Sequence, residues 1–299
     1  MATTKAASTK RATAKKPAAA KTTVRTVRAA DKPAAYSVSA SSKRKVSSLP
    51  DNIVNIVFAE LLGTFVLTLV ALLAFKETAA LYVGLTLSLL VVAVGATSGA
   101  HVNPAVTFGL WAMRKLKLVL VPFYWAAQFL GALLALVVTN WMTSGATLAN
   151  FSLFDHVSQM NWALFGVELV GMAVFMFGLA AAVSRVDLSA GTRALGVGFS
   201  LMVGLLVSGS LLANVQASVD TSKITDVKDV PHVLRVKGAA LNPAVAVAAT
   251  ESTDSSFTGT RGNSTEKLYS RFGLEVVLGT LVGAALGGNL YLLVAGRRN

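Results

Sequence analysis

The sequence predicts an all-α membrane protein with six membrane-spanning helices and two shorter re-entrant half-helices, arranged as an inverted repeat. Three observations support this fold class. Of the 299 residues, 54% are hydrophobic and only 14% are charged, whereas soluble domains carry roughly 25% charged residues. Six apolar segments are each long enough to cross a bilayer. Two further apolar stretches are shorter, and both begin with the same four residues, Asn-Pro-Ala-Val.

The six long segments are the predicted spanning helices, and two short segments are the predicted half-helices. At about 1.5 Å of rise per residue, neither short segment can cross a bilayer as a helix. The predicted spanning helices cover residues 53–75, 79–98, 117–141, 162–184, 193–213 and 272–295. The half-helices cover residues 103–112 and 242–250, and long connections at about 214–238 and 251–270 flank the second one.

The same structural unit occurs twice in the chain. Each unit has a helix with a glutamate, a helix with two glycines eleven residues apart, a half-helix and a third helix. The glutamates are Glu60 and Glu168. Because three helices per unit is an odd number, the second unit must cross the membrane in the opposite orientation. We expect repeat one at about 53–141 and repeat two at about 162–295.

The two Asn-Pro-Ala turns are predicted to meet at the centre of a pore. A single such turn is usually an ordinary helix start, but two matching copies favour a shared site. Pro suits the first position of a helix, Asn can cap the helix, and the small Ala allows close approach. Non-helical backbone at membrane depth requires surrounding protein or a water-filled cavity. The predicted pore-centre residues are Asn103, Pro104, Ala105, Asn242, Pro243 and Ala244.

Such a centre would pass neutral molecules and exclude charged ones. The side-chain amides of Asn103 and Asn242 can donate hydrogen bonds to a passing water oxygen, which orients the water and interrupts proton hopping. Each half-helix also directs its positive N-terminal end at the same point, which opposes cations. The predicted function class is therefore a passive channel.

Residues 1–50 are predicted to be a separate, disordered, basic cytoplasmic tail, and residues 51–299 the membrane domain. Residues 1–45 hold twelve Lys or Arg and one acid, Asp31, so the remaining chain is nearly neutral. The tail is suited to contact anionic lipid or nucleic acid, although a solubilising tail is the simplest interpretation. With six crossings, the side that holds both termini would carry nineteen Lys or Arg, against eight on the other. Because basic residues favour the cytoplasm, both termini are expected there, in a plasma membrane or bacterial inner membrane.

Several function classes receive no support from the composition. The chain has no Cys, which excludes disulfides and thiolate chemistry. Its three His residues are far apart in sequence, and no nucleophile–base pair is apparent. We therefore expect no enzyme activity, no metal site and no cofactor.

The motifs resemble those of the aquaporin (major intrinsic protein) family over about residues 53–296. The run from Ser98 to Thr107 is similar to the first loop of the family, and residues 127–132 are similar to its third helix. The resemblance implies a homotetramer with one pore per subunit, which conducts water and small neutral solutes through the bilayer. It also implies that Glu60 and Glu168 support the loops by accepting backbone N–H bonds, and that His101 borders the cytoplasmic half of the pore.

The sequence departs from the family at the predicted selectivity constriction. Family members usually have Arg directly after the second Asn-Pro-Ala, where this chain has Val245. The resemblance implies a constriction built from four positions, which counting from the motifs places at Val83, Leu205, Ala239 and Val245. Such a constriction would be wide, apolar and uncharged. Glycerol, urea and ammonia then become candidate solutes beside water.

Some alternatives remain open at this stage. A secondary transporter is also built from inverted repeats with broken helices, and a structural membrane protein with a closed pore would share the fold. Arg235 and Lys237 precede the second turn and are candidates for a replacement charge, although solvated loop residues are the simpler interpretation. Glu275 has no counterpart in the family pattern, and the neighbouring Arg271 indicates a position near the membrane surface.

Overall fold

A computed structural model describes residues 49–143, 150–154, 160–259 and 266–296 of the chain. These residues belong to one compact unit, Ser47–Asn299. Nearly all of the expected basic tail at residues 1–50 lies outside the described residues, so its predicted disorder stays a prediction.

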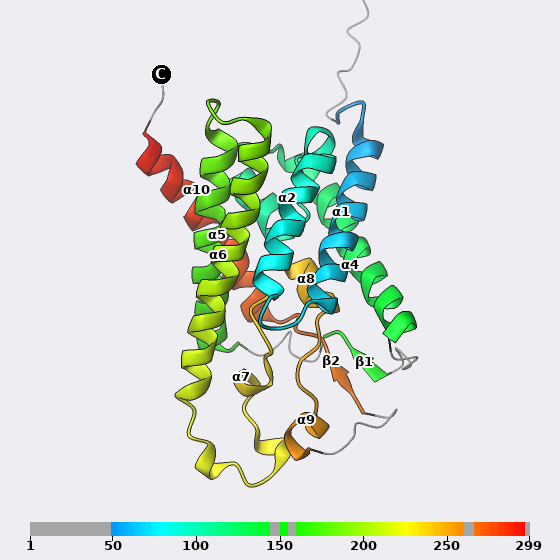
Figure 1. Ribbon diagram of the computed structural model, residues 1–299, viewed down its shortest axis with the longest axis vertical. Coiled ribbons are helices and arrows are strands. Elements are labelled where there is room, and N and C mark those ends of the chain that lie inside the picture. Colours follow the sequence, from blue (N-terminus) through cyan, green and yellow to red (C-terminus); the bar gives the residue numbers. More distant parts are fainter. Residues whose placement is uncertain (1–48, 144–149, 155–159, 260–265, 297–299) are drawn as a thin grey trace, which may run out of the picture. The chain divides into compact units, whose positions relative to one another are not determined.

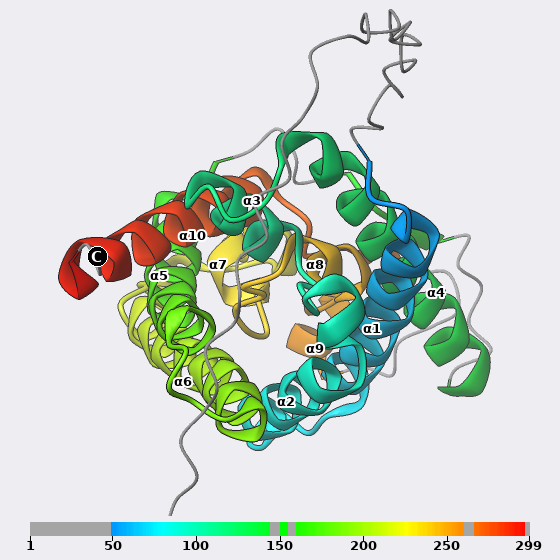
Figure 2. The ribbon, with the colours of Figure 1, turned by 90° about the horizontal axis from the view of Figure 1, so that it is seen from above.

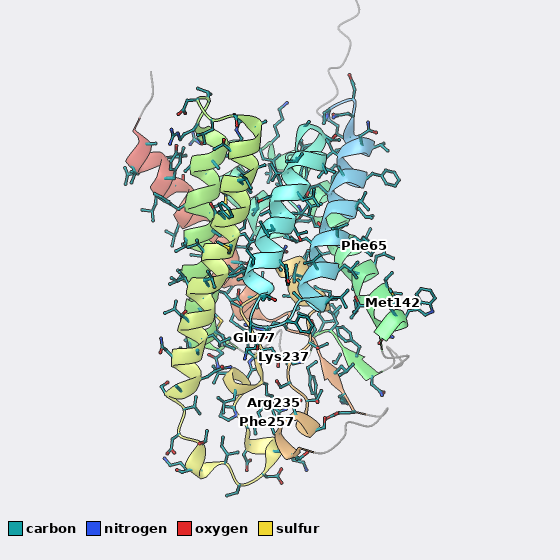
Figure 3. All side chains as sticks on the ribbon, in the orientation of Figure 1. Phe65, Glu77, Met142, Arg235, Lys237 and Phe257 are labelled. Carbon is teal, nitrogen blue, oxygen red and sulfur yellow. The ribbon has the colours of Figure 1, made fainter. Side chains whose placement is uncertain are left out.

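Six of the described helices are long and apolar enough to cross a bilayer, which confirms the predicted fold class (Figure 1). Large apolar side chains are exposed on their outward faces, and Met142, for example, points away from the bundle (Figure 3). A lipid surrounding accounts for this exposure, because these side chains would otherwise face water. The six helices are α1 (Ile53–Leu73), α2 (Ala79–Ser98), α4 (Val121–Thr143), α5 (Trp162–Ser184), α6 (Ala190–Ala217) and α10 (Leu274–Ala295).

Two half-helices complete the fold, α3 (Pro104–Ala112) and α8 (Pro243–Ala248). Seen from above, the long helices contact one another in the order α4, α1, α2, α6, α5 and α10 (Figure 2). Both half-helices contact α4 and α10, and they also touch each other, so they occupy the place between the two ends of this series. The pairs α1 with α4 and α5 with α10 are equivalent in the two repeats.

Most helix boundaries agree with the sequence within two residues, but α6 is longer than expected at both ends. Helix α6 begins at Ala190 instead of the expected residue 193, because Ser189 caps the helix and accepts a hydrogen bond from the backbone N–H of Thr192. Its end is extended because the side chain of Gln216 donates to the carbonyls of Val233 and Val236, at 2.9 Å each. Polar contacts with a later segment therefore stabilise a helical turn that hydropathy alone does not indicate.

The connections on the side where α5 begins form a structured region, which we call the cap, comprising residues 150–154, 218–238, 249–259 and 266–273. Strands β1 (Phe151–Ser152) and β2 (Leu268–Tyr269) pair in parallel, and a bridge joins Thr250 to Ser270. The hydroxyl of Ser270 also donates to the last turn of α8, at the carbonyls of Ala246 and Val247. The short helices of the cap are η3 (Thr221–Lys223), η4 (Val227–Asp229), α7 (His232–Arg235) and α9 (Asp254–Thr258). One further short helix, η1 (Leu118–Leu120), lies outside the cap and precedes α4 on the opposite side.

Glycine allows the closest helix contacts in each repeat. A Cβ built on Gly131 of α4 would lie 2.3 Å from the carbonyl oxygen of Leu61 in α1, and one on Gly283 of α10 would lie 2.5 Å from that of Leu169 in α5. Both distances are shorter than any real carbon–oxygen contact, so only glycine fits. Close approach of this kind is a common way for membrane helices to pack.

We predict that Gly131→Ala separates α1 from α4 and lowers thermal stability, because the added methyl meets rigid backbone. Overpacking of this type typically costs about 1–3 kcal/mol. Gly166→Ala in α5 is the matched control, because nothing lies within 4 Å of a Cβ at that position. Thermal denaturation of the detergent-purified variants measures both, and equal midpoints for the two variants would contradict the prediction.

Candidate functional site

The two Asn-Pro-Ala turns lie against each other where the N-termini of α3 and α8 meet. The side-chain amide of Asn103 donates to the backbone carbonyl of Leu241 at 2.8 Å, and that of Asn242 donates to the carbonyl of Val102 at 2.9 Å. Each asparagine thus donates to the residue just before the other asparagine. The predicted pore-centre residues of both repeats are therefore brought together by a reciprocal pair of hydrogen bonds.

Each asparagine also caps its own half-helix. The side-chain oxygen of Asn103 accepts from the backbone N–H of Ala105 at 2.8 Å, and that of Asn242 accepts from Ala244 at 3.0 Å. Pro104 and Pro243 occupy the first helical positions, where their missing N–H is not needed. The amide oxygen is therefore occupied locally, and the amide nitrogen points across to the other repeat.

The residues before the asparagines have an uncommon backbone conformation. Val102 has φ 42° and Leu241 has φ 48°, in the left-handed region that non-glycine residues rarely adopt. Both side chains are fully buried. Such a conformation costs about 1–3 kcal/mol and persists only where the surroundings determine it. Here it turns the carbonyl of each residue toward the asparagine of the other repeat.

Glu60 holds the backbone at Val102, the first of these two residues, through hydrogen bonds. Its carboxylate accepts hydrogen bonds from the backbone N–H groups of His101 and Val102, at 2.9 and 2.7 Å. The hydroxyl of Ser98 and the side-chain amide of Gln128 donate to the same carboxylate at 2.6 and 2.7 Å. We call Glu60, Ser98 and Gln128 the Glu60 cluster. All its donors are uncharged, and four bonds to one buried carboxylate compensate for its removal from water.

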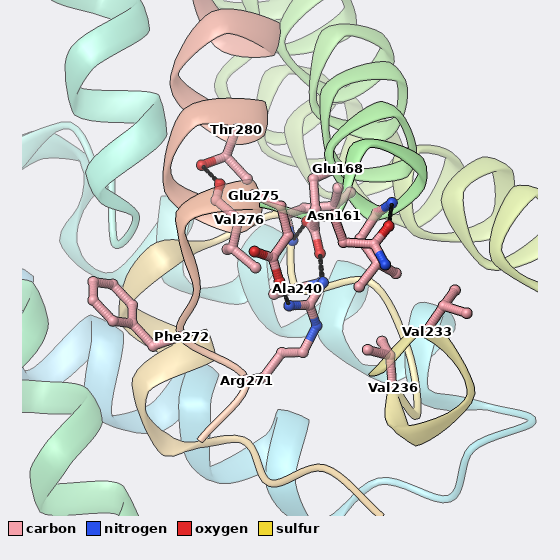
Figure 4. A network of polar contacts seen from close by, with 12 residues as sticks. Asn161, Glu168, Val233, Val236, Ala240, Arg271, Phe272, Glu275, Val276 and Thr280 are labelled. Carbon is pink, nitrogen blue, oxygen red and sulfur yellow. Dashed lines mark hydrogen bonds and ion pairs between the residues drawn. The ribbon is translucent and has the colours of Figure 1, made fainter. Parts of the chain in front are cut away.

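Glu168 fixes the second turn with different partners. It accepts from the backbone N–H groups of Ala240 and Leu241 at 3.0 and 2.9 Å. Its third donor is the guanidinium of Arg271, at 3.3 Å, and the same guanidinium donates to Glu275 at 2.8 Å (Figure 4). We call Glu168, Arg271 and Glu275 the Glu168 cluster. Glu275 thus forms a buried ion pair with Arg271, and its expected position near the membrane surface stays a prediction.

His101 lies beside the first turn and is almost fully buried. Its ring stacks on Tyr124, with centroids 4.5 Å apart, and its Nδ1 is 3.2 Å from the hydroxyl of Thr107. The hydroxyl of Tyr124 in turn donates to the carbonyl of Ser98 at 2.6 Å. These contacts fix the ring orientation, and the predicted place of His101 in the pore wall stays a prediction.

The four residues assigned to the constriction come from three helices and one loop. Val83 of α2, Leu205 of α6 and Ala239 pack into one apolar cluster, which brings together segments from both repeats. Val245 is buried in the first turn of α8. The role of these four uncharged residues in selectivity stays a prediction.

The two basic residues that precede the second turn have different surroundings. Arg235 donates to Asp254 and to the carbonyl of Val227, both at 2.8 Å, and its guanidinium lies 5.4 Å from the ring centre of Phe257 (Figure 3). Lys237 is exposed, and its ammonium is 3.5 Å from the hydroxyl of Thr250. Although the residue is exposed, the protein atoms around its ammonium partly desolvate it and lower the pKa of Lys237, and the Glu251 carboxylate partly opposes this shift. The guanidinium of Arg235 is therefore held by contacts within the cap.

Comparison with known proteins identifies the family. Residues 50–214, more than half of the chain, match the major intrinsic protein family. The chain belongs to the major intrinsic protein family. An aquaporin Z of Photorhabdus laumondii is 34% identical over 172 residues, which cover 50% of this chain and 74% of that protein.

Other members of the family match more narrowly. An aquaporin TIP1-2 of Zea mays is 37% identical over 123 residues, which cover 41% of this chain and 46% of the plant protein. The match therefore spans about half the length of such plant relatives. The X-ray structure of the aquaglyceroporin from Plasmodium falciparum has the same fold, with a TM-score of 0.51 and 18% identity over 80% of this chain and 95% of that one.

The sequence locates both Asn-Pro-Ala turns and both glutamates, but it does not identify the side-chain partners of the glutamates. Gln128 and Ser98 stand within motifs that resemble the family, but the motifs alone do not identify them as donors to Glu60. A polar amide within an apolar segment was the available signal for Gln128. For Arg271, the signal was a cation just before an apolar helix that begins with Glu275.

We predict that Glu60→Gln destabilises the first turn. Two donors approach each carboxylate oxygen, so an amide nitrogen in either position would face two hydrogen-bond donors. Burying donors without acceptors costs about 3 kcal/mol in such a site. Thermal denaturation and the yield of folded protein measure the effect. Glu77→Gln is the control, because Glu77 is exposed in the α1–α2 connection, and a similar loss for both would contradict the prediction.

Proposed function

We propose that this protein is a passive membrane channel that conducts water and small uncharged solutes. The reciprocal contact between Asn103 and Asn242 carries the proposal. A primary amide has two N–H donors, and among the described residues one donor of each asparagine is bound to the opposite turn. The second donor of each is then available to the oxygen of a molecule that passes between the turns.

This arrangement would conduct water and exclude protons. A water whose oxygen accepts from both asparagines has its hydrogens directed away from the turns, so it cannot accept a proton from a neighbouring water along the path. The positive N-terminal ends of α3 and α8 meet at the same point and oppose cations. The fold and the family membership support this function, because the related proteins are named aquaporins.

The apolar constriction would make the channel less selective than a strict water channel. A fixed arginine repels cations and donates to solute hydroxyls, and this chain has Val245 in that position. With Val83, Leu205 and Ala239 as the other three residues, neither charge nor strong donors would limit the entry of glycerol, urea or ammonia. We propose that these solutes pass together with water.

Membrane orientation and assembly follow the same reasoning. We propose that both termini are cytoplasmic, because the side that would hold them has the larger number of basic residues. The cap then faces the outside. The family resemblance suggests a homotetramer with one pore per subunit, and the basic tail at residues 1–50 would contact anionic lipid on the cytoplasmic surface.

Stopped-flow measurements on proteoliposomes test the function. We expect fast osmotic water flux, measurable flux of glycerol, urea and ammonia, and no proton conductance above that of empty liposomes. Saturable uptake driven by an ion gradient would instead indicate a secondary transporter. Absence of any osmotic flux would indicate a closed or structural protein.

We predict that Val245→Arg converts the channel toward a strict water channel. The added guanidinium narrows the constriction and introduces a positive charge, and we expect glycerol and urea permeability to fall about tenfold relative to water. Val245→Met is the control, because it adds length without charge. Equal solute-to-water permeability ratios in the wild type, Val245→Arg and Val245→Met would contradict the assignment of Val245 to the constriction.

Arg235→Ala is predicted to leave the solute-to-water ratio and the cation and proton leak unchanged, because the guanidinium of Arg235 is bound by Asp254 and by the Val227 carbonyl within the cap. Lys237→Ala is the informative comparison, since Lys237 is exposed two residues before Ala239. Cation and proton leak of both variants, measured beside the wild type, would show whether either residue replaces the missing arginine. A leak that rises in Arg235→Ala would contradict this prediction.

A further inference from the structure

The two buried glutamates occupy equivalent positions, but their side-chain partners are not equivalent. Gly131 packs on the carbonyl of Leu61, which follows Glu60, and Gly283 packs on the carbonyl of Leu169, which follows Glu168. The two glycines therefore correspond between the repeats. Gln128 stands three residues before the first glycine, so its counterpart is Thr280, three residues before the second.

Thr280 does not take the role of Gln128. Its hydroxyl donates to the carbonyl of Val276 in its own helix, at 2.7 Å (Figure 4), whereas Gln128 reaches across to Glu60. The second side-chain donor of the first repeat, Ser98, lies five residues before Asn103, and the residue five before Asn242 is Lys237. The ammonium of Lys237 lies near Thr250 in the cap. Both neutral donors of the Glu60 cluster are thus absent from the second repeat.

Arg271 supplies Glu168 with a side-chain donor that the second repeat otherwise lacks among the described residues. It precedes α10, and its backbone N–H donates to the carbonyl of Ala249 at the end of α8, at 2.8 Å. From there its guanidinium reaches Glu168, with one terminal nitrogen, and Glu275, with the other. The contact with Glu275 fixes the orientation of the guanidinium. Its other terminal nitrogen therefore faces the carboxylate of Glu168, which binds the backbone of Ala240 and Leu241.

The charges of the Glu168 cluster are buried and do not balance when both carboxylates are ionised. Arg271 is 4% exposed, and Glu168 and Glu275 are 0% exposed, so all three groups are removed from solvent. Two carboxylates share a single guanidinium. One oxygen of Glu275 and the Nε of Arg271 have no hydrogen-bond partner among the described residues. Removal of one member of such a buried set leaves uncompensated charge.

We propose that Arg271 is a positioning residue for the second pore turn and acts there as a charged substitute for Ser98 and Gln128. It binds Glu168, and Glu168 binds the backbone of Ala240 and Leu241, which places Ala239 and Asn242. Glu275 orients Arg271. The second turn therefore depends on an ion pair and the first on neutral hydrogen bonds. The effect on permeation rests on the proposed channel function, but the positional role does not.

Hydrogen exchange on the full-length protein tests the positional role without any transport measurement. We expect Arg271→Gln to accelerate exchange of the segment containing Ala240 and Leu241 by about tenfold, because two buried carboxylates then lack a cation. Exchange of the segment containing His101 and Val102 should not change. A variant that fails to fold would lose protection in both segments, so the comparison separates a local effect from a global one.

The double variant Arg271→Gln/Glu275→Gln distinguishes charge from packing. Removal of the second carboxylate leaves Glu168 with neutral donors, as in the first repeat, and we expect most of the lost protection to return. The replacement of Glu275 by Gln preserves size, so a role in packing alone predicts no recovery. Arg235→Gln is the matched control, because Arg235 lies in the same cap and has no contact with the Glu168 cluster.

Transport then shows whether the position of the turn matters for selectivity. We expect the proton leak per unit of water permeability to rise about tenfold in Arg271→Gln and to return toward wild type in the double variant. This ratio does not depend on the amount of folded protein, because both fluxes scale with it. Unchanged exchange at Ala240 and Leu241 in Arg271→Gln, or no recovery in the double variant, would overturn the proposal. Absence of water flux in the wild type would count against the channel function alone.

Discussion

The geometry of the site depends on two residues that are kept in a left-handed backbone conformation, Val102 and Leu241. The N–H of each is bound by a buried carboxylate, and its carbonyl is bound by the asparagine of the opposite repeat. The cost of the conformation, about 1–3 kcal/mol per residue, is offset by these bonds. Because each carbonyl is bound from the other repeat, each turn is stabilised by the opposite half of the protein.

Much of the fold could be predicted because lipid imposes a simple rule. Spanning segments must be helical and apolar, so length and hydropathy locate them, and the duplicated Asn-Pro-Ala turns fix the half-helices between them. Errors occurred where polar contacts between distant segments decide a boundary. The end of α6 is the clearest case, since Gln216 binds backbone carbonyls of α7 and its flank, and no local pattern in the sequence reports such a contact.

The candidate site was predictable where the two repeats are alike and not where they differ. Both asparagines and both glutamates stand at matching positions, so comparison of the repeats was sufficient to find them. The comparison fails for Arg271, which has no counterpart with the same role in the first repeat, and which reaches Glu168 from a segment 103 residues later in the chain. Comparison of the two units thus identifies the residues that they share, but it cannot identify Arg271, which acts in the second unit only.

The small sheet of the cap has a mechanical consequence. β2 is paired with β1, which lies between the two repeats, and the Ser270 that follows it binds both the Thr250 segment and the last turn of α8. A hinge motion at this end of the molecule would have to break several backbone hydrogen bonds at once. The cap thus ties together the connection between the repeats, the end of α8 and the start of α10, and displacement of any one of the three would strain the other two.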